Sequence, residues 1–274
     1  MPEGHSIHRY ARLHRALLGG RTVAAWSPQG RFDAGAKLID GTTLRTVEAH
    51  GKHLFYRFTD PGPRPHGAAL HLALHVHLGL FGRFRQYRDE PAAPTPGTRL
   101  VLAAGDAQLQ LAGAVACEVI DPAAEAALRA RLGPDPLRGD DPGPAFAALR
   151  RRRAGIGQAL LDQRVIAGIG NVYRAEALFL IGVHPDRPAR EIDAATFDHL
   201  WSALRRLLVA GERTGRIVTV QPQDRDRPPS RLHADERVYV YRRTGLPCRR
   251  CGTPVRAWEL AARTMYACPV CQAA

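Results

Sequence analysis

Hydrophobic positions in the first 120 residues follow two different periods. Between residues 7 and 18 apolar side chains recur at helical spacing, and Gly19-Gly20 follows, which predicts one short amphipathic helix. From residue 21 to about residue 120, short apolar stretches such as HLFYRF, TRLVLAA and AQLQLA are broken by Gly, Pro and Asp. This alternation predicts an all-β sandwich or barrel. Because no helical pattern separates these stretches, a parallel βαβ sheet is not expected.

The pattern becomes helical after Asp121-Pro122. Helical periodicity is found in AAEAALRARL, AFAALRRRRAGIGQALLDQ, YRAEALFLIG and AATFDHLWSALRRLLVAGE. Residues 214–233, rich in Arg, Asp and Pro, are expected to form a mobile segment. The predicted fold class is α+β, with a β-sandwich domain over residues 1–120, a helical domain over 121–237 and a separate terminal unit over 238–274.

Four of the five cysteines predict a metal site in the terminal unit. Cys248-x-x-Cys251 and Cys268-x-x-Cys271 are separated by sixteen residues, the spacing of tetrahedral four-cysteine zinc sites. With every position filled by sulfur, no coordination site is left for a catalytic water, so we expect one structural Zn(II) per chain. Cys117 stands alone and is predicted to be a small buried hydrophobic residue.

The charge balance indicates a polyanionic partner. Lys and Arg number 39 against 26 Asp and Glu, which gives a formal charge of +13 and a pI near 10.4. An Arg-rich genome would produce the same bias, so charge alone leaves both explanations open.

The sequence shows neither a membrane span nor a signal peptide. No run of 18 apolar residues occurs, and the start MPEGHSIHRY lacks the apolar stretch of a signal peptide. We therefore expect a protein located in the cytoplasm, without a membrane partner. We also expect it to be monomeric and, given a polyanionic partner, associated with the nucleoid.

The second residue is Pro2, so removal of the initiator Met1 would expose a secondary amine. An α-amino group has a pKa of about 7.7 to 8.0, against about 10.4 for Lys, and is therefore more nucleophilic at neutral pH. Attack on a sugar C1′ by a secondary amine gives a permanently cationic iminium, which can drive elimination. Glu3 lies beside the amine, where a carboxyl group can move protons.

Together with the cysteine pairs, this start resembles the formamidopyrimidine-DNA glycosylase and endonuclease VIII family. The motifs that carry the resemblance, in order along nearly the whole chain, are MPEG, HGKHLF, HLGLFGR, LGPDPL, LLDQRVIAGIGNVYRAEALFLIGVHP and VYRRTGLPCRRCG through ARTMYACPVCQ. The resemblance implies a catalytic β-sandwich, a helix-two-turn-helix DNA-binding domain and a zinc-finger hairpin. It also implies damaged DNA as the partner, a base-excision repair glycosylase that nicks abasic sites, Pro2 as nucleophile and Glu3 as acid and base.

The resemblance implies further roles in holding DNA. Lys52 matches a lysine that acts near the sugar and phosphate, Asn171 a phosphate-binding asparagine, and Arg263 the zinc-finger arginine. Gly168 and Gly170 would let backbone amides and the N-terminus of the next helix approach a phosphate. A protein that keeps this scaffold but only binds damaged DNA, without catalysis, is the alternative.

The chain also departs from the family pattern. Gly4, His5, Ser6 and His8 replace the usual residues after the opening Pro-Glu, and residues 110–115 lack the Arg and Phe that some members insert into the duplex. Leu80 is the candidate for an intercalating side chain. Without the arginine, discrimination of the opposite base should be weak, and oxidised pyrimidines should be preferred over 8-oxoguanine.

His71, His75 and His77 suggest a second metal site. We do not expect one, because no Cys or carboxylate near them in the sequence completes a ligand set.

Overall fold

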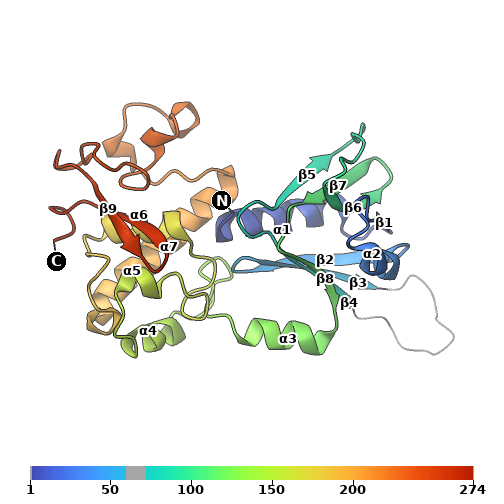
Figure 1. Cartoon of the computed structure of the whole chain (residues 1–274), viewed down its shortest axis with the longest axis horizontal. Coiled ribbons are helices and arrows are strands. Elements are labelled where there is room, and N and C mark those ends of the chain that lie inside the picture. Colours follow the sequence, from blue (N-terminus) through green and yellow to red (C-terminus); the bar gives the residue numbers. More distant parts are fainter. Residues whose placement is uncertain (1, 60–71, 274) are drawn as a thin grey trace. The chain divides into compact units, whose positions relative to one another are not determined.

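The computed structural model describes residues 2–59 and 72–273, and Figure 1 shows the path of the chain. Two compact units follow one another in the sequence, Met1–Arg131 and Leu132–Ala274. Met1 and His71 lie outside the described residues. Among the described residues, no helix combines the length and the hydropathy that a membrane span requires.

The first unit contains two antiparallel four-stranded sheets. One has the order β2-β3-β4-β8, with β2 (Thr43–His50), β3 (His53–Thr59), β4 (Leu72–His77) and β8 (Ala116–Ile120). The other has the order β1-β6-β7-β5, with β1 (Ala24–Trp26), β6 (Thr98–Ala104), β7 (Ala107–Ala112) and β5 (Arg83–Tyr87). Both sheets contribute to one buried cluster, including Leu54 and Leu74 from the first and Leu102 and Leu109 from the second. The alternating apolar positions of the strands thus form the core of a β-sandwich, as the sequence predicted.

Helix α1 (Gly4–Leu18) is the predicted amphipathic helix, and it packs against β2 and β3. Ile7, Leu17 and Leu18 belong to the sandwich core because the helical period places them on one face. The chain leaves the helix through Gly20, which has a φ of 76° and so adopts the left-handed conformation that glycine favours.

A second helix, α2 (Asp33–Ile39), lies between β1 and β2, where the sequence predicted no helix. The prediction was wrong because α2 has only seven residues and buries two of them, Ala36 and Ile39. Two buried positions are too few for a helical period to show.

Helix α3 (Pro122–Ala130) belongs to the first unit, although its periodicity marked the start of the helical domain in the sequence. Asp121 caps it by accepting from the Ala124 amide at 2.7 Å. A closed set of ion pairs ties α3 to the sheet, since Glu125 and Glu48 each contact both Arg57 and Arg129 at 2.6–3.1 Å.

The second unit is helical up to a terminal hairpin. Its elements are α4 (Gly143–Arg150), α5 (Ile156–Ala159), α6 (Asn171–Leu180), η1 (Ala189–Glu191), α7 (Ala194–Thr214), the short helices η2 (Pro222–Asp224), η3 (Pro229–Arg231) and η4 (Asp235–Arg237), then β9 (Arg256–Leu260) and β10 (Arg263–Ala267). The buried helix α6 and one face of α7 form the centre of its core.

The terminal hairpin, expected as a separate unit, shares this core. Tyr239, Met265 and Cys268 are buried in the same cluster as Phe179 and Leu204 of the helices. The buried carboxylate of Glu176 in α6 also binds the chain just before the hairpin. It accepts hydrogen bonds from the backbone amides of residues 239, 240 and 241 at 2.7–2.9 Å and from the Thr219 hydroxyl.

Candidate functional site

Pro2 and Glu3 are held at the start of α1. The carbonyl oxygen of Glu3 accepts from the amides of Ser6 and Ile7 at 3.0 and 3.3 Å and from the Ser6 hydroxyl at 2.9 Å. The Glu3 residue is fully buried, and Pro2 is half-buried. The first turn of α1 therefore fixes the backbone of Glu3 and, through it, the position of the preceding proline nitrogen.

Helix α1 also carries two buried histidines. Burial lowers the pKa of His5 to about 4 and that of His14 to about 3, so both are neutral at physiological pH. The Nδ1 atom of His14 lies 2.6 Å from the Tyr56 hydroxyl in β3. This neutral pair connects α1 to the sheet that carries Lys52.

Lys52 lies in the two-residue turn between β2 and β3. His50 and His53 close the turn as cross-strand partners, and Gly51 has a φ of 58°, which a residue with a side chain rarely adopts. The Lys52 side chain is half-buried. In the view of Figure 1 this turn and the N-terminal end of α1 both lie at the left end of the first unit.

An exposed apolar tip is formed by Leu80, Phe81 and Val115, which are 46%, 82% and 73% exposed. The first two lie in the β4–β5 turn and Val115 in the β7–β8 turn. The turns touch, since a Cβ added to Gly79 would meet Val115 Cγ2 at 2.3 Å. Leu80 was identified from the sequence, but Phe81 was missed. Phe81 follows Leu80 in HLGLFGR, and only the structure separates it from the buried aromatic residues of the strands.

In the second unit, the loop before α6 is shaped by Gln163, a residue that sequence reasoning missed. Its side-chain oxygen accepts from the Gly168 amide at 2.9 Å, and its nitrogen donates to the Ile169 carbonyl at 2.9 Å. Gly168 has a φ of 91°, and Gly170 is the N-cap of α6. The loop therefore sets the N-terminus of α6, the positive end of a ten-residue helix, at Gly170.

Asn171, the first residue of α6, contacts the terminal hairpin. Its Nδ2 donates to the Thr264 carbonyl at 3.0 Å, and Thr264 follows Arg263 in β10. Arg263 is exposed. The structure thus brings Asn171, the two glycines and the start of β10 together within one unit. The turn before Arg263 is strained, because Ala261 and Ala262 both have a φ of 55°.

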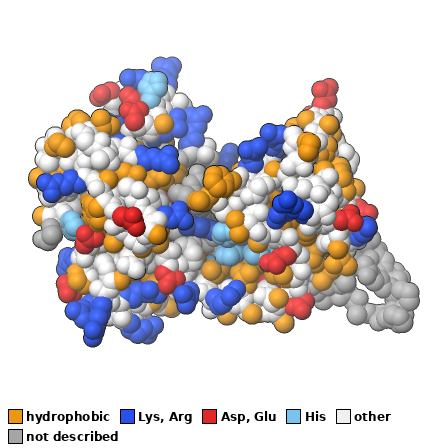
Figure 2. All heavy atoms as spheres, in the orientation of Figure 1, with side chains coloured by type: hydrophobic (Ala, Val, Ile, Leu, Met, Phe, Trp, Pro, Cys, Tyr) orange, Lys and Arg blue, Asp and Glu red, His pale blue; other side chains and the backbone are white. Residues whose placement is uncertain are grey.

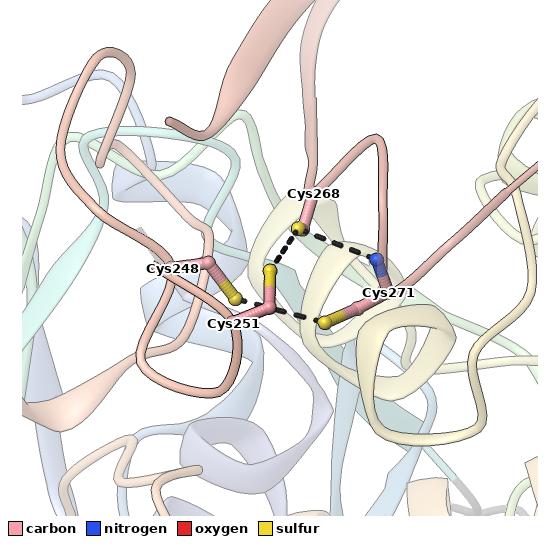
Figure 3. A group of neighbouring side chains, drawn as sticks. All are labelled: Cys248, Cys251, Cys268 and Cys271. Carbon is pink, nitrogen blue, oxygen red and sulfur yellow. Dashed lines mark hydrogen bonds between the residues drawn. The ribbon is translucent and has the colours of Figure 1, made fainter. Parts of the chain in front are cut away.

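The four paired cysteines form a group arranged to bind a metal ion, with their sulfur atoms all within 4.8 Å of one another (Figure 3). Cys248 and Cys271 sulfurs lie 3.8 Å apart, and those of Cys251 and Cys268 lie 3.4 Å apart. The amides of Arg250 and Cys271 donate to the Cys248 and Cys268 sulfurs at 3.4 Å. Such N–H···S bonds stabilise thiolates, which is the form that binds metals.

In the described part of the chain, the four cysteines are the one group of three or more clustered ligands, and the histidines of β4 are not part of it. Sequence reasoning placed no carboxylate near these histidines. A carboxylate does lie beside them, since Glu118 of β8 contacts His75 at 2.9 Å. The two residues are 43 positions apart, so only the pairing of β4 with β8 brings them together.

Two family models match the chain. The formamidopyrimidine-DNA glycosylase N-terminal domain matches residues 1–114, and the formamidopyrimidine-DNA glycosylase H2TH domain matches residues 132–221. The chain is also 43% identical to the protein named endonuclease 8 1 of Mycobacterium tuberculosis, over 99% of this chain and 100% of the relative. The chain belongs to the formamidopyrimidine-DNA glycosylase family. The resemblance inferred from the motifs is thereby confirmed.

Another relative supports the family assignment, and solved structures show the same fold. The probable endonuclease 8 2 of Streptomyces coelicolor is 33% identical over 100% of this chain and 94% of its own length. Lactococcus lactis Fpg in complex with DNA containing an abasic site matches at a TM-score of 0.78 and 23% identity, over 98% of this chain and 99% of that one. Its complex with DNA containing an oxidised pyrimidine matches at 0.79 and covers 100% of both chains. The predicted fold, sheets followed by a helical domain and a cysteine cluster, is confirmed.

Proposed function

We propose that the protein is a bifunctional DNA glycosylase and abasic-site lyase that removes oxidised bases, with pyrimidines preferred. The observation that carries the proposal is the start of α1, where a buried carboxyl residue follows a proline in a member of this family. Damaged DNA is the proposed substrate and partner, as in the DNA complexes of Lactococcus lactis Fpg.

In the proposed reaction the amine of Pro2, freed from Met1, attacks C1′ of the damaged nucleotide. The bond to the base breaks, and the departing base takes up a proton equivalent to the one that the amine loses on attack. The sugar ring then opens, with Glu3 supplying a proton to the ring oxygen. The product is an iminium linking Pro2 to the sugar. Loss of a C2′ proton then expels the 3′ phosphate by β-elimination, and a second elimination expels the 5′ phosphate. Hydrolysis of the iminium by water releases the Pro2 amine and the sugar aldehyde, so no external oxidant or reductant is needed.

Other residues of both units are proposed to hold the DNA. Lys52 would contact the sugar-phosphate near the reacting centre. Asn171, with the amides around Gly168 and Gly170, would bind a phosphate at the positive end of α6, and Arg263 would add a guanidinium beside them. Leu80 would enter the base stack.

Zinc is the proposed metal of the four-cysteine group. A tetrahedral ion with Zn–S bonds of about 2.3 Å places its sulfurs about 3.8 Å apart, close to the two separations described above. With four protein ligands the ion would be structural. It would hold the segments before β9 and after β10, and thereby the turn that presents Arg263.

Borohydride trapping tests the nucleophile. Wild-type protein mixed with an abasic-site duplex and borohydride should form a stable cross-link, and Pro2→Gly should reduce it severely. Pro91→Gly, an exposed proline in the loop after β5, is the matched control and should cross-link like wild type. An unimpaired Pro2→Gly variant would overturn the proposed mechanism.

Glu3→Gln separates catalysis from binding. It keeps the size of the buried side chain but removes its acid, so base excision should be lost while affinity for lesion DNA is retained. If wild type binds lesion DNA without excising or cross-linking, the protein is a damage-binding protein rather than an enzyme.

A further inference from the structure

A group of histidines and one carboxylate lies on a single face of the β2-β3-β4-β8 sheet. His53 is the cross-strand partner of His77, and His75 is the partner of Glu118. Partners in antiparallel strands point to the same face, and residues two apart in a strand do so as well. All four side chains therefore share this face, and Figure 2 shows histidine side chains gathered on the surface over the ends of β2 and β3.

Two hydrogen bonds join three of these residues into a chain. Glu118 Oε1 lies 2.9 Å from His75 Nδ1, and His75 Nε2 lies 2.9 Å from His53 Nδ1. The two rings are stacked, with centroids 5.1 Å apart and planes 19° apart. His75 is only 3% exposed and also stacks on Phe55. The middle of the chain is therefore held rigidly by packing.

The direction of these hydrogen bonds, from donor to acceptor, follows from the chemistry of the Glu118 carboxylate. An ionised carboxylate only accepts hydrogen bonds, so His75 must carry its proton on Nδ1. A neutral imidazole then has a lone pair on Nε2, which accepts from a proton on His53 Nδ1. Burial, with His77 and His75 nearby, lowers the pKa of His53 to about 3, so this ring is neutral. The Nε2 atom of His53 is left as an acceptor.

In His77 the proton lies on the other ring nitrogen, Nε2 rather than Nδ1. Its Nδ1 lies 3.2 Å from the Gly79 amide, which can only donate, so the ring proton of a neutral His77 lies on Nε2. Lys52 contributes, after burial and His75, to lowering the pKa of His77, and it precedes His53, the cross-strand partner of His77. Beside Lys52 the sheet thus presents one accepting and one donating imidazole nitrogen.

Neighbouring carboxylates do not compete with Glu118 for the hydrogen bond to His75, because arginines hold them. Glu48, on β2, is ion-paired with Arg57 and Arg129, and Glu125 of α3 is held by the same two arginines. His50 of β2 and Arg131, at the C-terminal end of α3, are the other titratable groups facing His53, and both also lower its pKa. Among the charged groups that the structure places around this face, Glu118 is the carboxylate bonded to His75.

We propose that Glu118, His75 and His53 form an orienting relay that fixes the β2–β3 turn and thereby the position of Lys52. Glu118 and His75 are positioning residues that act through His53, which closes that turn. The role of Lys52 in this inference rests on the proposed function, whereas the protonation pattern of the relay does not.

Histidine NMR tests the relay without any assay of activity. In ¹⁵N-histidine-labelled protein at neutral pH, long-range ¹H–¹⁵N spectra should show the Nδ1–H tautomer for His53 and His75 and the Nε2–H tautomer for His77. In Glu118→Leu, His75 and His53 should move toward the Nε2–H form that free histidine favours. The Glu118 side chain is 55% exposed, so this change should not unfold the sandwich. Asp106→Leu, which removes a carboxylate with 58% exposure from the opposite sheet, should leave the tautomers unchanged. An Nε2–H tautomer at His53 in wild type, or unchanged tautomers in Glu118→Leu, would overturn the relay.

Single-turnover cleavage of an abasic-site duplex tests the effect on Lys52. Glu118→Leu should slow the first-order step by about tenfold while the dissociation constant changes less than about twofold, because a small displacement near the reacting atoms affects the rate more than binding. Asp106→Leu should behave as wild type. A rate unchanged in Glu118→Leu, with the tautomers shifted, would overturn the positioning role. A wild-type protein that cleaves nothing would instead refute the proposed function, while the NMR result still decides the relay.

Discussion

At the scale of single residues, Phe81 is the most exposed large hydrophobic side chain in the described part of the chain. A phenylalanine 82% exposed at the end of a tight turn contributes little to the core, and beside Leu80 and Val115 it offers a surface that could stack on bases. If this tip fills the space left by a flipped base, it supplies an apolar wedge of the kind that the sequence assigned to Leu80 alone.

We therefore expect Phe81→Ala to slow base excision from duplex DNA by about one to two powers of ten, since stacking of an aromatic ring on a base contributes about 1–3 kcal/mol. Leu80→Ala should have a smaller effect, because Leu80 is less exposed. The control is Leu38→Ala on α2, whose 47% exposure matches the 46% of Leu80. Single-turnover rates on a duplex with thymine glycol give the measurement, and equal rates for Phe81→Ala and the control would exclude Phe81 from the wedge.

Arg263 places a single exposed guanidinium at the start of β10. If it neutralises one phosphate, Arg263→Ala should weaken binding and lower the slope of log K against log salt by about one. Arg256→Ala removes an exposed arginine from the other end of the same hairpin and should leave the slope closer to wild type. Fluorescence anisotropy over a salt series provides the slopes. An Arg263→Ala slope equal to that of wild type would remove this residue from the phosphate contacts.

At the scale of elements, the terminal hairpin is coupled to the helices through Glu176 and through its own buried residues. Loss of the metal should therefore destabilise the whole second unit, while the sandwich, which has its own core, stays folded.

Cys268→Ser should abolish the zinc content of about one ion per chain and lower the melting temperature of the second unit. Cys117→Ser changes a cysteine outside the metal group and should keep one zinc. Metal analysis by mass spectrometry and limited proteolysis measure the two effects. Protein purified without chelator and free of zinc would contradict the assignment of the metal.

At the scale of the whole molecule, the buried neutral histidines make stability depend on pH. His5, His14 and His53 all belong to the first unit, and burial lowers the pKa of each to between about 3 and about 4. In the unfolded chain the pKa of each is about 6.5. The unfolded state therefore binds more protons below pH 6.5, so stability is fully present above pH 6.5 and is lost as the pH falls toward the folded values.

We expect His14→Phe to reduce this dependence. Between pH 7.5 and 4.5 the wild type should lose roughly 2–3 kcal/mol of unfolding free energy through His14 alone, and the variant should lack that loss. Urea denaturation followed by circular dichroism at both pH values gives the comparison. His199→Phe, an exposed position on α7, is the control and should follow wild type. If His14→Phe loses as much stability on acidification as wild type, then His14 does not carry the dependence.

The sequence by itself determined what depends on local order along the chain. The period of apolar residues gave α1 and the sandwich strands, because each alternation is set by the geometry of its own element. The spacing of Cys248, Cys251, Cys268 and Cys271 predicted the metal group, because a two-residue gap is a local constraint. The motif order was enough for the family.

Tertiary structure decided what depends on which strands are neighbours and which side chains face solvent. Glu118 and His75 meet because β8 pairs with β4, and Asn171 meets Thr264 across 93 positions. The exposure of Phe81 is decided by the turn that carries it. The terminal hairpin was expected as a separate unit, but its buried residues belong to the core of the helices. These contacts join segments far apart in sequence. No local sequence pattern predicts them, because they form only when distant segments pack together in the fold.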